Sequence, residues 1–209
     1  MFELCVITDR KLSNGLSEAD IARRAYEGGA DIVQLRMKDS DGKEMLEQAL
    51  KIRAIADDYA GIFIVNDRVD IAHLSDADGV HLGQSDIPVK YARKVLGDDK
   101  IIGASAHNVQ EAIEAENKGA NYVGVGSIYT TSTKQDAQQG IGIGVISEVR
   151  QAVDIPVIAI GGINRGNIQE VIIAGANGVA VVSAVVSQKD ITAATQELRE
   201  MIMKVRPNI

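Results

Sequence analysis

The stretch "IFIVNDRVDIAHLSDADGVHLGQSD", residues 62–86, joins two short apolar runs through one helix-like segment. The first run leads directly into Asn66 and Asp67, and the second, "GVHLG" at 79–83, leads to Asp86. Short apolar runs that alternate with helical segments are typical of parallel strands. Because the carboxyl ends of neighbouring parallel strands lie at one edge, we expect the two acidic ends to be close in space.

The same alternation of strand and helix runs along the whole chain. It predicts one (β/α)8 barrel, a TIM barrel, that spans residues 1–209 as a single catalytic domain. The expected strands are "ELCVITD" (3–9), "DIVQLRM" (31–37), "IFIVND" (62–67), "GVHLG" (79–83), "IIGASAH" (101–107), "YVGVGSI" (122–128), "PVIAIGG" (156–162) and "GVAVVSA" (178–184). The clearest helical patterns lie at 17–29, 42–60, 109–119 and 191–206.

A weak internal repeat supports the barrel. "GGADIVQL" (28–35), "SDADGVHL" (75–82), "KGANYVGV" (118–125) and "AGANGVAV" (174–181) each place small residues and Asp or Asn before an apolar run. The glycine is expected to end the preceding helix in a left-handed conformation. A doubly wound open sheet is the competing fold, but it needs a glycine-rich dinucleotide turn after the first strand, and "ITDRKLSNGLSE" (7–18) lacks one.

Composition limits the possible partners. The chain has 209 residues, a formal net charge of −7, no Trp and only 3% aromatic residues, which argues against nucleic-acid binding. The single cysteine, Cys5, excludes an internal disulfide, fits a reducing cytoplasm, and is interpreted as a buried structural thiol. No signal peptide or membrane-spanning run is recognised, so we expect a cytoplasmic protein without membrane contacts. No helix shows an obvious exposed apolar stripe, but one sequence does not decide the oligomeric state, so a homodimer stays open.

The second expected strand carries a polar row. Side chains alternate along a strand, so Gln34, Arg36 and Lys38 share one face while the apolar residues at 33, 35 and 37 share the other. The apolar face is expected to pack under the helices, and the polar face to point to the barrel mouth. Two cations and an amide in a row suit a phosphate or diphosphate, although a solvated strand end is the simpler interpretation.

Asp67 and Asp86 follow the third and fourth strands. Together with phosphate oxygens, two carboxylates facing cations match a Mg²⁺ site, because Mg²⁺ takes one or two protein carboxylates and fills its shell with water and phosphate. The alternative is that each aspartate caps the helix that follows it. Among the histidines, His81 is interpreted as a core residue or one behind the ligand-contacting layer, and His107 with Ser105 as a possible ligand contact.

A second anion site is expected at the later strands. The loop after the sixth strand carries Thr131, Ser132, Thr133 and Lys134, whose hydroxyls, amides and ammonium suit a phosphate, although threonine-rich turns are common. "AIGGI" at 159–163 and Ser183 lie where barrels often bind phosphate. One metal-assisted diphosphate site and one phosphate site suggest the joining of two phosphorylated small molecules.

These motifs resemble the thiamin phosphate synthase family. "QLRMK", "NDRVDIA", "ADGVHLGQSD", "GVGSIYTTSTK", "AIGGI" and "VAVVSA" stand in that family's order and spacing over essentially the whole chain. The resemblance implies a transferase of thiamine biosynthesis that couples a hydroxymethylpyrimidine diphosphate to a thiazole phosphate and releases pyrophosphate. It implies one Mg²⁺ per site and a dissociative substitution without a protein nucleophile.

The resemblance also implies residue roles. The pyrimidine diphosphate is expected at Gln34, Arg36, Lys38, Asn66, Ser105 and Lys134, of which Arg36, Lys38, Ser105 and Lys134 are the catalytic candidates. Mg²⁺ is expected at Asp67 and Asp86. Thiazole phosphate is expected at Thr131, Ser132, Thr133, Gly162, Val182 and Ser183. Ser127 and Thr130 depart from the family's prolines in this loop, which leaves the pose of the loop open.

Two other functions remain as alternatives. A related thiazole tautomerase, an isomerase on the same barrel, resembles the chain at the last two strands but need not keep the metal acids or the cationic row. A non-catalytic binder of thiamin precursors has little use for the groups that activate a leaving group. The sequence leaves open whether the thiazole substrate carries a carboxylate.

Overall fold

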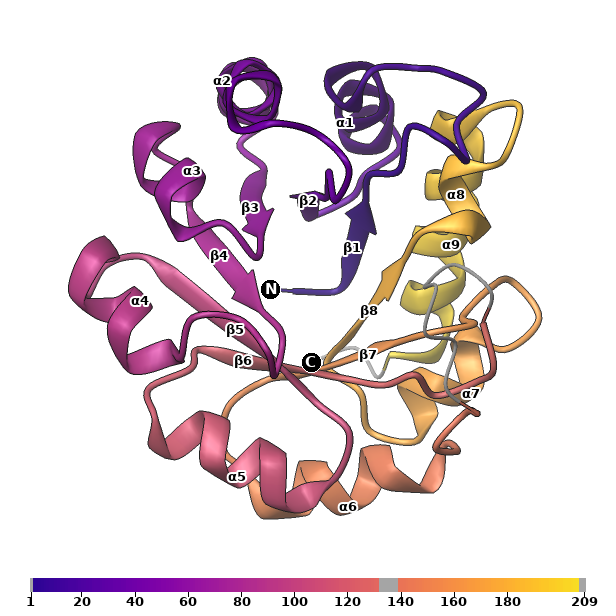
Figure 1. Cartoon of the computed structure of the whole chain (residues 1–209). Helices are drawn as coiled ribbons and strands as arrows, with labels where there is room; N and C mark the ends of the chain where they lie inside the picture. Colours follow the sequence, from indigo (N-terminus) through magenta and orange to yellow (C-terminus); the bar gives the residue numbers. More distant parts are fainter. Residues whose placement is uncertain (1, 132–138, 207–209) are drawn as a thin grey trace.

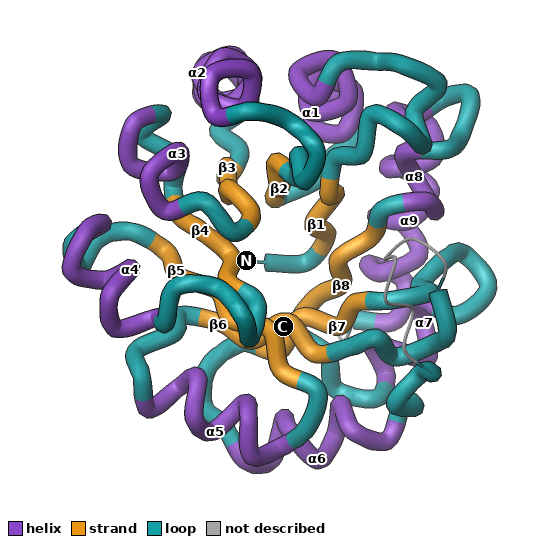
Figure 2. The backbone as a smooth tube through the Cα atoms, viewed as in Figure 1, coloured by secondary structure: helices purple, strands orange, loops and turns teal. Residues whose placement is uncertain are grey.

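The computed structural model describes residues 2–131 and 139–206, and it confirms the barrel. Eight parallel strands pair in chain order and close into one barrel, with β1 pairing to both β2 and β8. The helices form an outer ring around the strands (Figures 1 and 2). Each strand therefore points its carboxyl end to the same face of the barrel.

Eight strands and nine helices make up the described part of the chain. The strands are β1 (Leu4–Ile7), β2 (Ile32–Leu35), β3 (Ile62–Asn66), β4 (Gly79–Leu82), β5 (Ile101–Ala106), β6 (Tyr122–Val125), β7 (Val157–Ile160) and β8 (Gly178–Val181). The helices are α1 (Glu18–Glu27), α2 (Gly42–Asp58), α3 (Val69–Leu74), α4 (Val89–Leu96), α5 (Val109–Asn117), α6 (Gly144–Ala152), α7 (Ile168–Ile173), α8 (Ser183–Val186) and α9 (Ile191–Val205).

The sequence repeat marks the start of every second strand. Its second position is left-handed each time, as expected for Gly29, Gly119 and Gly175, while Asp76 takes the same conformation without being glycine. Its Asp or Asn accepts a hydrogen bond from the backbone of the preceding strand, so the repeat fastens the strands in pairs. The bonds run from Leu4 N to Asp31 Oδ2 (3.0 Å), Phe63 N to Asp78 Oδ2 (2.7 Å), Ile102 N to Asn121 Oδ1 (2.8 Å) and Val157 N to Asn177 Oδ1 (2.8 Å).

The core has two layers. The larger layer lies between strands and helices, and a smaller one fills the barrel interior with Cys5, Ile7, Ile32, Ile64, Tyr122, Ile158 and Ala180. Phe2 closes the interior from the amino-terminal end, with its ring centroid 5.9 Å from that of Tyr122. Cys5 is buried, as the sequence predicted, and burial raises the pKa of its thiol to about 12. A thiol in this state is a packing group rather than a nucleophile.

The outer surface differs from the sequence interpretation at α4. Ile87, Tyr91 and Val95 follow one another at helical spacing and are each about half exposed, so this region does carry an exposed apolar row. The sequence pattern does not reveal this row, because residues 89–96 form a short segment that lysines interrupt. Lys90 and Lys94 both lie over the Tyr91 ring. No helix within residues 2–131 and 139–206 is long and apolar enough to cross a membrane.

Candidate active site

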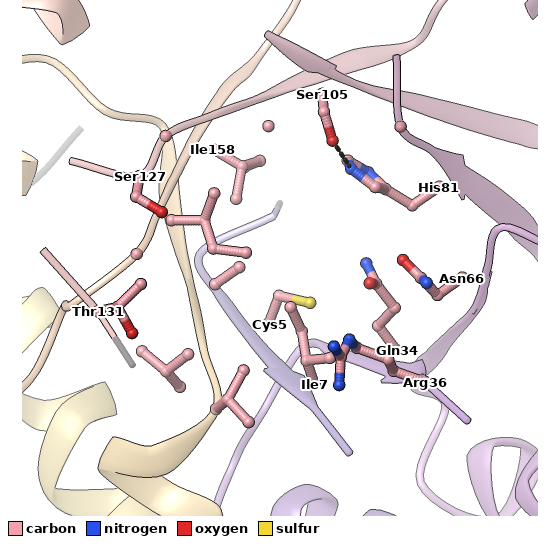
Figure 3. Close-up of a pocket in the computed structure, with 18 of the residues that line it drawn as sticks. Cys5, Ile7, Gln34, Arg36, Asn66, His81, Ser105, Ser127, Thr131 and Ile158 are labelled. Atoms are coloured by element: carbon pink, nitrogen blue, oxygen red, sulfur yellow. Dashed lines mark hydrogen bonds between the residues drawn. The ribbon is translucent and has the colours of Figure 1, made fainter. Parts of the chain in front are cut away.

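A cavity of about 400 Å³ opens at the carboxyl ends of the strands, and residues from all eight strands or the loops after them line it. Figure 3 shows its interior, with Gln34, Arg36, Asn66 and His81 gathered on one side and Ser127, Thr131 and Ile158 on the other. The cavity therefore lies where chemistry is found in this fold.

The polar row on β2 points into the cavity as the alternation predicted. Gln34, Arg36 and Lys38 line the cavity, whereas residues 33, 35 and 37 are buried in the layer under the helices. The Arg36 guanidinium lies 3.3 Å from the Asp9 carboxylate, and both side chains are largely buried. Lys38 lies 3.7 Å from Asp67 and is half exposed. The cations are thus held at the cavity edge by carboxylates, with donors left for a ligand.

Neither metal-ligand candidate caps a helix. The N-cap residue of α3 is Arg68 and that of α4 is Pro88, and neither helix has a capping hydrogen bond from a side chain. Asp67 has φ of 65°, and its N–H donates to the His81 carbonyl at 2.9 Å, so the turn aims its carboxylate into the cavity. Asp86 accepts from Gly83 N at 2.6 Å. The capping alternative is therefore wrong for both residues.

The two aspartates form one acidic pair on the cavity wall. Burial raises the pKa of Asp67, and the neighbouring Asp86 carboxylate raises it further, while Lys38 and Arg36 act in the opposite direction. Within the described residues no group of three or more His, Cys, Asp or Glu side chains converges on one point. Two adjacent carboxylates, whose repulsion Lys38 and Arg36 do not fully offset, fit a hard divalent cation that completes its shell with water and phosphate.

Histidine and tyrosine side chains lie behind the polar wall. His81 Nε2 is 2.9 Å from Ser105 Oγ and His81 Nδ1 is 2.9 Å from the Tyr122 hydroxyl. His81 also lines the cavity, so it is closer to a ligand than a core residue would be. His107 lines the cavity too, but its Nδ1 pairs with Glu111 at 2.8 Å.

The opposite wall is built from backbone and apolar side chains. Ile128 N donates to Ile160 O at 2.9 Å and Tyr129 N to Gly161 O at 3.1 Å, so the loop after β6 continues its pairing beyond the strand. Gly161 and Gly162 both have positive φ, and a Cβ on Gly162 would lie 2.7 Å from the Tyr129 Cβ. The glycines therefore let this loop lie directly on the end of β7.

The structure brings most of the predicted site residues into one cavity. Those that line it are Gln34, Arg36, Lys38, Asn66, Asp67, Asp86, Ser105, Thr131, Gly162, Val182 and Ser183. Ser132, Thr133 and Lys134 lie outside the described residues. Their roles, and those of the residues in the cavity, stay predictions at this point.

Sequence reasoning missed three polar neighbours. Asp9 holds Arg36, and Gln84 Nε2 donates to the Ser105 carbonyl at 2.5 Å. The sequence could have predicted the contact of Asp9, because a carboxylate at the end of the first strand lies next to the cations at the end of the second. Tyr122 gave no such signal, because an aromatic residue at the start of a strand indicates only core packing.

Comparisons with known proteins agree with this geometry. Residues 4–185 match the family model described as thiamine monophosphate synthase. A thiamine-phosphate synthase of Methanocella arvoryzae is 49% identical over 205 residues, covering 98% of this chain and 97% of that protein. One of Chloroflexus aurantiacus is 48% identical, covering 96% and 93%.

A solved structure supports the same assignment. The thiamine phosphate pyrophosphorylase of Pyrococcus furiosus superimposes with a TM-score of 0.91 at 43% identity, covering 98% of this chain and 96% of that one. Family model, full-length identity and fold point to one group of proteins. The chain therefore belongs to the thiamine monophosphate synthase family, a family of transferases.

Proposed function

We propose that the chain couples 4-amino-2-methyl-5-hydroxymethylpyrimidine diphosphate to thiazole phosphate and releases pyrophosphate, with residues 1–209 acting as one catalytic domain. One observation carries the proposal: Arg36 and Lys38 line the same cavity as the adjacent carboxylates Asp67 and Asp86. Cations beside a divalent-metal pair are what a departing diphosphate needs. A simple binding protein gains little from such an arrangement.

The diphosphate end of the pyrimidine substrate is assigned to β2 and β3. Arg36 offers a planar fork of donors, Lys38 a compact ammonium, and Asn66 an amide at the end of β3. Lys134 is assigned to the same diphosphate on the family pattern. Gln34 and Ser105 lie deeper in the cavity and are assigned to the pyrimidine ring.

Asp67 and Asp86 are assigned to one Mg²⁺ ion because burial and the adjacent Asp86 carboxylate raise the pKa of Asp67, so a bound cation would relieve the repulsion between the two carboxylates. When bound, the ion supplies charge stabilisation to the diphosphate oxygens as the leaving group departs. Lys38, 3.7 Å from Asp67, adds a second positive charge on the same side. The carboxylates hold their positions through the Asp67 turn and the Gly83 amide.

The reaction needs no protein nucleophile. The bond between the pyrimidine methylene carbon and the diphosphate oxygen breaks, and its electron pair leaves with pyrophosphate. The methylene cation, supported by the ring amino group, is captured by the thiazole nitrogen, whose lone pair forms the new C–N bond. What the protein supplies is charge stabilisation on one wall and alignment of the two rings across the cavity.

Thiazole phosphate is assigned to the opposite wall. Thr131, Gly162, Val182 and Ser183 line that side, and the family pattern adds Ser132 and Thr133. Ile160 and Ile163 form an apolar surface beside them, which suits a neutral ring. The partners are thus small phosphorylated molecules, and the oligomeric state is left to measurement.

The test incubates pure protein with both substrates and Mg²⁺ and follows thiamin phosphate as its fluorescent thiochrome, with an EDTA control. Mg²⁺-dependent product supports the proposal. Folded, Mg²⁺-loaded protein that makes no product overturns it. Isomerisation of a thiazole phosphate in the same preparation would then indicate a tautomerase, and binding without any turnover would indicate a binder of thiamin precursors.

A further inference from the structure

Three side chains inside the barrel form a hydrogen-bonded chain. Tyr122 of β6, His81 of β4 and Ser105 of β5 are joined by two contacts of 2.9 Å each, from the Tyr122 hydroxyl to His81 Nδ1 and from His81 Nε2 to Ser105 Oγ. The dashed line in Figure 3 marks the second contact, with Ser105 at the cavity wall. The chain therefore runs from the closed interior to the point where a ligand binds.

Two glycines make room for this chain. A Cβ on Gly103 would lie 2.1 Å from the Tyr122 ring, and a Cβ on Gly124 would lie 2.9 Å from His81 Cε1. Any larger residue at these strand positions displaces a ring. The neighbouring strands are thus shaped to hold both rings in one orientation.

The geometry decides which atom donates at each contact. Tyr122 is buried, burial raises the pKa of its hydroxyl well above the usual value, and within the described residues His81 is its one hydrogen-bond partner. If His81 carried a proton on Nδ1, the phenol hydrogen would have no acceptor, and a buried donor without a partner is costly. The phenol therefore donates to Nδ1.

The donor in the first hydrogen bond determines the donor in the second. A neutral imidazole whose Nδ1 accepts carries its proton on Nε2, which donates to Ser105 Oγ. The Ser105 hydroxyl accepts from His81, so its own hydrogen is directed to a ligand. Gln84 holds the same residue through its backbone carbonyl at 2.5 Å, which leaves the hydroxyl unused by it.

We propose that Tyr122 and His81 are positioning residues that make Ser105 a hydrogen-bond donor to an unprotonated ring nitrogen of the pyrimidine substrate. The inference rests on the proposed function for the identity of that ring. It adds a selection rule: the site prefers a ring with an acceptor at this point over one with a C–H or N–H there. It also leaves the ring uncharged, which favours formation of the methylene cation.

The first test reads the imidazole directly and needs no substrate. The chain has three histidines, so ¹⁵N spectra of labelled protein resolve each ring, and the His81 signals are those lost in His81→Gln. At a pH above the histidine range, wild type is expected to show a protonated Nε2 and a bare Nδ1 for His81. Tyr122→Phe, which keeps the ring, is expected to give a mixture of tautomers. A protonated Nδ1 in wild type overturns the proposal.

The second test is a substrate comparison. Binding of the pyrimidine diphosphate is measured against two analogues, each with one ring nitrogen replaced by CH, in the absence of thiazole phosphate. Wild type is expected to bind one analogue about tenfold more weakly, the loss of one hydrogen bond. Tyr122→Phe and Ser105→Ala are expected to lose most of that discrimination. Tyr26→Phe is the matched control, because it removes a buried hydroxyl, bonded to Ile62 O at 2.7 Å, outside the cavity.

The outcomes separate this inference from the proposed function. Equal weakening of all three ligands by Tyr122→Phe means a structural role and overturns the inference, even where thiamin phosphate is formed normally. If Tyr122→Phe does not fold, Ser105→Ala and the wild-type spectra decide. If wild type makes no product, the proposed function fails, and the His81 tautomer still tests the hydrogen-bond chain.

Discussion

The two walls of the cavity are built by different means. Charged side chains line the β2–β4 side. In the described part of the chain, every Arg, Lys and Asp that lines the cavity comes from this side. On the β7–β8 side and at β1, the lining is glycine, serine and apolar side chains such as Ile7 and Ile160. One wall is suited to a leaving group, the other to an aligned ring.

The difference separates two chemical tasks in one small cavity. Charged side chains around the whole cavity would hold water beside the thiazole ring, whose nitrogen must reach the methylene carbon. An uncharged wall holds a ring by shape and leaves its nitrogen lone pair available. If the comparison is right, changes on the charged wall affect turnover most, and changes on the uncharged wall affect thiazole phosphate binding.

The largest effect is expected for Asp67→Asn. Asparagine accepts the left-handed backbone of this position, so the fold should be kept while one charged metal ligand is lost. We expect turnover to fall about 100-fold or more, with a raised Mg²⁺ requirement. Asp58→Asn, on the exposed end of α2, is the control. Wild-type turnover at saturating Mg²⁺ would remove Asp67 from the metal site.

Arg36→Lys tests whether geometry or charge alone serves the diphosphate. Lysine keeps the charge but loses the planar fork, and a charge-assisted hydrogen bond contributes about 1.5–3 kcal/mol. We expect kcat/KM for the pyrimidine diphosphate to fall about 30-fold, with KM for thiazole phosphate unchanged. Arg23→Lys, exposed on α1, is the matched control. A loss shared equally by both substrates would show that Arg36 supports the fold of the site rather than the diphosphate.

Gly162→Ala tests the uncharged wall. Alanine at φ of 67° is strained, and its Cβ would press on Tyr129 at 2.7 Å. Gly119→Ala, at the left-handed end of α5 with φ of 90° and nothing within 4 Å, isolates the backbone strain of about 1 kcal/mol. We expect KM for thiazole phosphate to rise about tenfold only in Gly162→Ala. Identical kinetics and unfolding curves for the two variants would refute a role for the loop contact.

Ser183→Ala gives the smallest effect. One hydroxyl contributes about 1 kcal/mol of net hydrogen bonding, so KM for thiazole phosphate should rise about fivefold at nearly unchanged kcat. Ser147→Ala, whose hydroxyl bonds Gly144 O on α6, is the control. An effect confined to the pyrimidine diphosphate would place the two substrates the other way round and would undo the assignment of the walls.

The sequence alone predicted the barrel and most of the charged wall. The period of two along residues 33–38 and the order of strands and helices are local patterns. A closed barrel of parallel strands places all carboxyl ends on one face, independently of how the side chains pack. Hence Gln34, Arg36, Asp67 and Asp86 were found in one cavity as expected. Their chemical types and positions along the strands carried that prediction.

Only the tertiary structure decided how the other contacts meet. Hydrogen bonds among Tyr122, His81 and Ser105 join three strands, and the Asp and Asn side chains of the sequence repeat join the strands in pairs. A glycine is needed at 162 because the loop that carries Tyr129 lies against it. Such contacts depend on register and on the space left by distant glycines, neither of which a linear pattern encodes. The sequence determined which chemistry the strand ends carry, and closure of the barrel decided which groups face one another.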